Sequence, residues 1–187
     1  MKIISDIAEK EIVIQVAKQM LTAARTAPKA HGDDSIVALA LTDEDKDALA
    51  LRTKELGEEY KQDFMIRDSK MIKHCHAVVL IGVKDETAGV GKVCQFCGFE
   101  NCGKAMKAGA DCALKVTDLG IAVGSAVSIA ADNRIDNRVF FSAGKAALTL
   151  GLLGENVKLA YAIPLGADGK SVFFDRISSP QLADLQV

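Results

Sequence analysis

The sequence is poor in aromatic residues and prolines. Only 5% of its 187 residues are Phe, Tyr or Trp, no Trp is present, and there are 3 prolines. The core must therefore be aliphatic. A hydrophobic content of 49% with 26% charged residues is typical of a folded globule, which excludes a disordered or low-complexity chain. We predict one domain over residues 1–187, since this length suits a single domain.

The sequence also lacks an excess of charge and a long hydrophobic run. Lys and Arg number 23 against 25 Asp and Glu, and no basic stretch carries interleaved aromatic residues, so we expect no nucleic-acid binding. The longest charge-free apolar run, residues 119–131, is shorter than the ~20 residues of a membrane span. The first fifteen residues mix charges with apolar residues, unlike a secretory signal. We predict a cytoplasmic protein that does not bind membranes.

Cysteine is scarce but clustered. Five cysteines are too few for a disulfide scaffold, yet four of them lie close together, namely Cys94, Cys97, Cys102 and Cys112. The C-x2-C-x4-C spacing of the first three lets one loop surround a compact inorganic centre. Thiolates are the preferred ligands of iron–sulfur clusters, because sulfur is a soft donor. The sequence therefore predicts a 4Fe-4S cluster within a cysteine-rich insert at residues 85–112.

The fourth ligand depends on a break in the backbone. One continuous helix from Cys102 to Cys112 would hold the two sulfurs roughly 15 Å apart, too far for one cluster. Gly109 follows a helical stretch and suits the left-handed conformation that ends helices. We therefore expect a helix from Cys102 that ends near Ala108, so that the chain returns Cys112 to the cluster.

Other interpretations of the cysteines stay open. Structural zinc also accepts four cysteines, although it usually has two C-x2-C pairs. A thioredoxin-like dithiol would use Cys94 and Cys97 alone. Cys75 is a second candidate for the fourth ligand, but it lies between His74 and His76 at a strand start, where alternation points neighbours to opposite faces. A zinc-stapled structural protein, or an iron–sulfur sensor without catalysis, is thus the alternative to a redox protein.

Hydrophobic periodicity predicts an α+β domain with a mixed sheet flanked by helices. An Asp6–Glu9 capping box is expected to start the first helix, and Gly154 is expected to follow the last. The expected helices are residues 6–25, 43–60, 65–74, 113–131 and 139–153, and the expected strands are residues 35–42, 77–84, 157–166 and 170–176.

The segment CQFCGFENCGKAMKAGADC resembles a small 4Fe-4S domain found in several anaerobic redox proteins. Over nearly the whole chain, the sequence also resembles a bacterial and archaeal family of uncharacterised ferredoxin-domain-containing proteins. This second resemblance rests on the cysteine motif and on APKAHGDDS, DLGIAVGSAVSIAADNRIDNR and FSAGKAA. It implies iron–sulfur redox chemistry, as an oxidoreductase or an electron-transfer protein with a redox partner protein. It identifies no substrate and no catalytic residue.

The order of elements outside the insert is similar to the FMN-dependent nitroreductase fold. Residues 27–32, residues 118–122 and the segment YAIPLG match that family's loop, helix and closing strand, although Lys29 and Gly32 replace its Ser and Asn. The resemblance implies an FMN site, with Arg25 and Lys29 binding the phosphate and His31 lining the pocket. It also implies a homodimer, which the apolar helix at residues 113–131 independently predicts.

Overall fold

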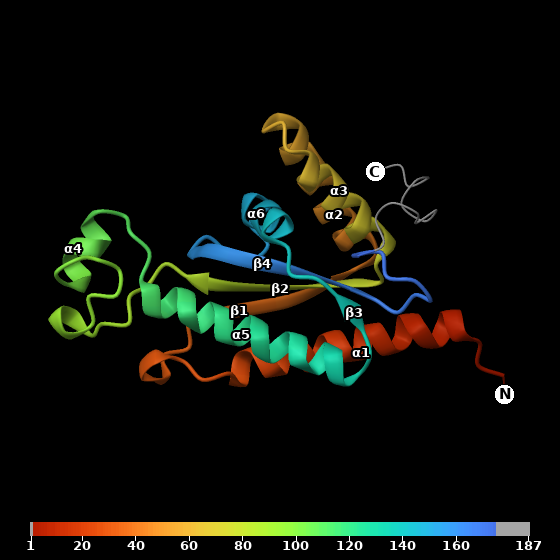
Figure 1. Cartoon of the computed structure of the whole chain (residues 1–187), viewed down its shortest axis with the longest axis horizontal. Coiled ribbons are helices and arrows are strands. Elements are labelled where there is room, and N and C mark those ends of the chain that lie inside the picture. Colours follow the sequence, from red (N-terminus) through yellow and green to blue (C-terminus); the bar gives the residue numbers. More distant parts are fainter. Residues whose placement is uncertain (1, 175–187) are drawn as a thin grey trace.

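The computed structural model describes residues 2–174 as a four-stranded sheet with helices on both faces (Figure 1). The strand order is β1-β2-β4-β3. The strands are β1 Ile36–Thr42, β2 Ala77–Lys84, β3 Asp136–Asn137 and β4 Val157–Gly166. The helices are α1 Ser5–Thr26, α2 Asp43–Glu59, α3 Asp63–His74, α4 Cys102–Lys107, α5 Ala113–Asp132 and α6 Phe141–Thr149, with short 3-10 turns η1 Ala30–Gly32 and η2 Gly91–Val93.

The α+β class predicted from the sequence is confirmed. A mixed sheet was expected, whereas each strand pair in the described part of the chain is antiparallel. The order of the sheet follows from long connections. Between β2 and β4 the chain passes through the cysteine segment and helices α4 to α6, so no local turn dictates how these two strands pair.

Strand β2 is the centre of the core because both of its faces are covered. Val79 and Ile81 pack with α1 and α5 on one face, while Val78 and Leu80 pack with α2, α3 and α6 on the other. Successive side chains of a strand point to opposite faces, so a strand buried on both sides reads as an unbroken apolar run. The run AVVLIGVK thus reflects two cores that share one strand.

Several expected element ends are wrong. Helix α1 begins at Ser5 after Ile4, which makes no capping hydrogen bond, so the Asp6–Glu9 capping box is absent. Helix α6 ends at Thr149, earlier than expected, because the left-handed residue that follows it is Gly151, with φ 67°. Gly154 is also left-handed, with φ 90°, but it lies beyond the end of the helix. Strands 77–84 and 157–166 are confirmed with the expected bounds.

The expected final strand at residues 170–176 is not formed over its described part. Residues 172–174 form a turn, and residues 175–176 lie outside the described residues. Val172 and Phe173 are buried in the core on the α6 side of the sheet. Burial of these two side chains places the segment in the core, where it does not extend the sheet as a hairpin partner of β4.

Helix α5 packs beside α1 against one face of the sheet (Figure 1). Although the helix is apolar, Val116 and Ile121 are about two-fifths exposed, and Gly124 lies on the same outer side. By length and composition α5 is the one described helix that is apolar enough to cross a membrane, a test that core helices of soluble proteins also pass. The buried face of α5 packs in the core formed with α1 and the sheet.

Residues 85–112 leave the sheet between β2 and α5. Figure 1 shows this segment, with α4, beyond the end of the sheet and next to the N-terminus of α5. Besides η2 and α4, it contains no described helix or strand, and its buried hydrophobic residues are Ala88 and Ala105. So small an apolar core cannot by itself order a segment of this length.

Candidate metal centre

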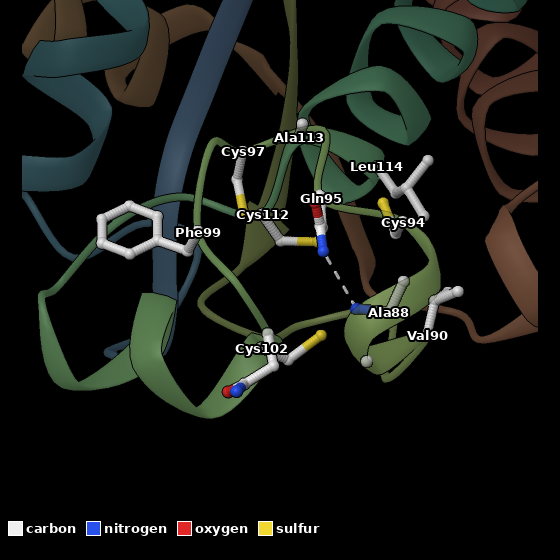
Figure 2. A pocket seen from close by; sticks show the side chains of 12 residues that line it. Ala88, Val90, Cys94, Gln95, Cys97, Phe99, Cys102, Cys112, Ala113 and Leu114 are labelled. Carbon is white, nitrogen blue, oxygen red and sulfur yellow. Dashed lines mark hydrogen bonds between the residues drawn. The ribbon is translucent and has the colours of Figure 1, made fainter.

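Four of the five cysteines line one cavity at the end of the sheet. The cavity measures about 300 Å³, including the space open to solvent, and Figure 2 shows the four side chains around it. They are the cysteines expected from the motif, Cys94, Cys97, Cys102 and Cys112. All four are free thiols and partly exposed. They come from three places in the chain: the loop after η2, the first residue of α4, and the residue before α5.

The loop between Cys94 and Cys102 is shaped by local backbone contacts. Gln95 and Gly98 both adopt positive φ angles, 51° and 80°, and the Gly98 amide donates to the Gln95 carbonyl at 2.9 Å. Asn101 then caps α4, because its side-chain oxygen accepts a hydrogen bond of 3.0 Å from the Lys104 amide. Together these contacts turn the chain around the cavity and place Cys102 at the start of a helix.

The turn at Gly109 returns the chain to the cavity, as the sequence predicted. Helix α4 ends at Lys107, and Gly109 has φ 68°. The Gly109 amide donates to the Met106 carbonyl, and the Ala110 amide donates to the Ala105 carbonyl, each at 3.0 Å. This pair of bonds is the usual termination of a helix by a left-handed glycine.

Cys112 lies where positive potential is available. It is the N-cap residue of the 20-residue helix α5, where the helix dipole is positive, although its side chain makes no hydrogen bond to the helix amides. The Ala88 amide donates to its Sγ at 3.5 Å (Figure 2). A backbone amide of this kind can also donate to the sulfur of a metal-bound cysteine.

Cys75 belongs to a different part of the molecule. It follows α3, is 3% exposed, and packs in the core cluster on the α2, α3 and α6 side of the sheet. Burial, together with the nearby Asp168 carboxylate, raises the pKa of its thiol well above the ordinary range. Its neighbour His74 pairs through Nε2 with Asp168 Oδ1 at 3.2 Å. Cys75 therefore does not line the cavity with the other four cysteines.

A single metal ion and an iron–sulfur cluster require different distances between their ligands. Around one zinc, with Zn–S bonds of about 2.3 Å, four sulfurs lie within roughly 4 Å of one another. Within residues 2–174, however, no three His, Cys, Asp or Glu side chains are grouped closely enough to hold a single metal ion. In a four-iron cluster each thiolate binds a different iron, so the sulfurs are held further apart around a cavity.

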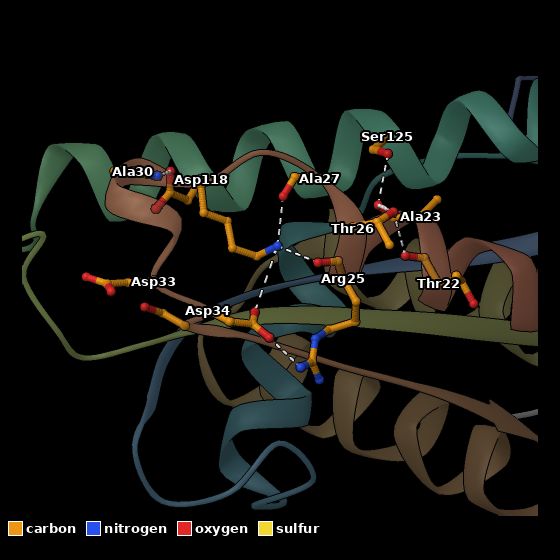
Figure 3. A network of polar contacts seen from close by, with 12 residues as sticks. Thr22, Ala23, Arg25, Thr26, Ala27, Ala30, Asp33, Asp34, Asp118 and Ser125 are labelled. Carbon is orange, nitrogen blue, oxygen red and sulfur yellow. Dashed lines mark hydrogen bonds and ion pairs between the residues drawn. The ribbon is translucent and has the colours of Figure 1, made fainter.

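The residues suggested for a flavin phosphate are already engaged with each other (Figure 3). The Lys29 ammonium, 6% exposed, donates to the carbonyls of Arg25 at 2.5 Å and Ala27 at 2.8 Å, and lies 3.8 Å from Asp34 Oδ1. The Arg25 guanidinium pairs with the other Asp34 oxygen. An FMN phosphate would have to displace these partners, so the arrangement does not fit phosphate binding. His31 lies exposed in η1.

Two positioning groups near the cavity were missed by sequence reasoning. Asn101 could have been found, since Asn immediately before a helix is a common cap. Lys158 could not, because it comes from β4, far along the chain. Its ammonium donates to the Gly109 carbonyl at 2.9 Å and pairs with Asp111 at 3.0 Å. The hydrogen bond with Asp111 raises the pKa of Lys158.

Solved structures share this fold at low sequence identity. A nitroreductase from Lactococcus lactis, CinD in complex with nicotinic acid, is 18% identical, with a TM-score of 0.56 over 86% of this chain and 80% of that one. An oxidoreductase containing FMN is 14% identical, with a TM-score of 0.58 over 83% and 67% of the two chains. A putative nitroreductase in complex with FMN from Desulfovibrio desulfuricans is 16% identical, with a TM-score of 0.53 over 84% and 76%. The predicted nitroreductase-like fold is confirmed.

Sequence relatives extend over most of the chain. An uncharacterized protein of Archaeoglobus fulgidus is 41% identical over 166 residues, which cover 84% of this chain and 88% of the relative. Residues 108–176 match the family described as "Uncharacterized protein containing a ferredoxin domain". The matched segment contains Cys112 but not the other three cavity cysteines. The chain therefore belongs to the family of uncharacterized proteins that contain a ferredoxin domain.

Proposed function

We propose that this chain is an iron–sulfur redox protein in which Cys94, Cys97, Cys102 and Cys112 bind one 4Fe-4S cluster. The observation that carries the proposal is that four cysteines from three separate parts of the chain share one cavity. The family's ferredoxin domain and the nitroreductase-like fold point to the same broad role in oxidoreduction or electron transfer.

The chain supplies ligands, positive potential and access. A bound 4Fe-4S cluster supplies reversible one-electron transfer. The N-terminus of α5 and the Ala88 amide favour negative charge at Cys112, and reduction adds negative charge. The cysteines are partly exposed, so an electron donor or acceptor protein can approach without opening the core.

The proposal extends to the whole chain as one cytoplasmic domain with a cysteine-rich insert at residues 85–112. We also propose a homodimer that covers the apolar outer surface of α1 and α5, where Ile7, Ile12 and Ile121 are at least 40% exposed. Sedimentation at micromolar concentration tests this assembly. A monomer alone would contradict it, as would an Ile121→Glu variant that assembles like the unchanged protein.

We do not extend the proposal to a flavin enzyme. The nitroreductase-like structures establish the fold, and a fold outlasts changes of cofactor. The enclosed Lys29 ammonium argues against phosphate binding in that region. Flavin absorption in the purified protein would overturn this interpretation.

The test is anaerobic purification followed by absorption spectroscopy and metal analysis. We expect a brown protein with about four iron and four sulfide ions per chain. Reduction by dithionite should bleach the visible absorption and produce a paramagnetic signal, because one electron enters the cluster. A colourless protein with one zinc per chain would refute the proposal and favour the structural-zinc alternative.

A further inference from the structure

Strand β4 contains an irregularity next to the cysteine segment. Pairing with β2 joins Val83 to Leu159 but Lys84 to Val157, so Lys158 has no partner in the register. Val157 packs on the α6 side of the sheet and Leu159 on the α1–α5 side, although residues two apart in a regular strand face the same way. Lys158 is therefore the extra residue of a β-bulge, a feature that often redirects a side chain beside a functional site.

The redirected ammonium contacts both ends of the cysteine segment. Lys158 Nζ donates to the Gly109 carbonyl at 2.9 Å, lies 3.0 Å from Asp111 Oδ1, and lies 3.6 Å from Asp85 Oδ1. Asp85 directly follows β2, where the chain leaves the sheet, whereas Gly109 and Asp111 lie where it returns to α5. One side chain thus connects the backbone where it leaves the sheet with the backbone where it returns.

Lys158 also lies close to the fourth cysteine. It lines a second hollow of about 200 Å³, including open space, together with Cys112, Asp111 and the buried Lys115. Asp111 immediately precedes Cys112, so fixing the Asp111 carboxylate restricts the backbone that carries the Cys112 sulfur. Without the ammonium, the Asp85 and Asp111 carboxylates would lose their common counter-charge.

We propose that Lys158 is a positioning residue for the iron–sulfur centre. It links the two ends of the cysteine segment and holds Cys112 close to the other three ligands. This inference rests on the proposed function. It has two measurable consequences. Loss of the ammonium should let the two ends of the cysteine segment separate, so the cluster should be released faster. It should also leave two uncompensated carboxylates near the cluster, which disfavours added negative charge and lowers the reduction potential.

The test compares Lys158→Met with Lys158→Arg after identical anaerobic reconstitution. The methionine variant keeps the length of the side chain and removes its charge, while the arginine variant keeps the charge and the donors. Lys145→Met, at an exposed position on α6, is the matched control. The readouts are the rate of iron loss to a chelator, the reduction potential, and the far-ultraviolet circular dichroism, which verifies folding.

We expect Lys158→Met to lose iron several-fold faster than the unchanged protein and to have a lower reduction potential. Lys158→Arg should recover most of both properties, and Lys145→Met should alter neither. Unchanged iron loss and potential in a folded Lys158→Met protein would overturn the inference while leaving the proposed function intact. If the unchanged protein binds no iron–sulfur cluster, the proposed function fails, and the inference falls with it.

Discussion

Substitution of Gly109 tests directly whether the returning turn completes the metal centre. Gly109 has φ 68°, and a Cβ added there would meet no other heavy atom within 4 Å. The cost of Gly109→Ala is therefore confined to the backbone, because nothing crowds the new methyl group. Holding an L-residue in the left-handed region costs about 1–2 kcal/mol.

That cost sets the size of the expected effect. Binding of metal and ordering of its ligand loop are commonly one event, so the strain in the turn subtracts from the free energy of cluster binding. A change of 1–2 kcal/mol corresponds to a roughly 5- to 30-fold weaker retention of the cluster. The assay is iron content after anaerobic reconstitution, followed by competition with a chelator over a range of concentrations.

Gly151 provides a matched control elsewhere in the fold. It ends α6 with φ 67°, its amide donates to the Leu148 carbonyl, and a Cβ there would also meet nothing within 4 Å. Gly151→Ala should cost a similar free energy in global unfolding but leave cluster retention unchanged. Equal iron retention in the Gly109→Ala and Gly151→Ala proteins would refute the role assigned to the turn.

Three further predictions follow from individual contacts. Serine at any of the four cavity cysteines should abolish full cluster incorporation, whereas Cys75→Ser should preserve it; the iron content of each variant decides. Gly144→Ala should lower the free energy of unfolding by about 1–3 kcal/mol, because its Cβ would lie 2.0 Å from a β4 carbonyl oxygen. A Cβ at Gly120 would have no other heavy atom within 4 Å, so Gly120→Ala should not destabilise the protein. Denaturant titration measures both free energies. The pKa of Asp168 is lowered mainly by its hydrogen bond with His74, so its contribution to stability should be complete above about pH 4 and decrease as pH falls through the lowered folded pKa. Acid titration of unfolding should show a smaller loss in Asp168→Asn, and equal losses would contradict the pairing.

The sequence alone determined the features that depend on neighbouring residues. The spacing of Cys94, Cys97 and Cys102 predicted a shared site because a short loop limits how far apart its side chains can lie. The left-handed turn at Gly109 was predictable for the same reason, since the end of a helix depends on a few adjacent residues. Strands 77–84 and 157–166 were found from their apolar runs.

Tertiary structure decided the features that depend on residues far apart in the chain. Local patterns left Cys75 as a candidate ligand, and packing of α3 against the sheet placed it in the core away from the cavity. Lys29 was a plausible phosphate ligand until the fold surrounded its ammonium with two carbonyls and Asp34. Lys158 had no sequence signal, because its role comes from a bulge in the pairing of β4 with β2 and from contacts across the chain. Such contacts form only when the whole chain has folded, so periodicity and spacing contain no information about them.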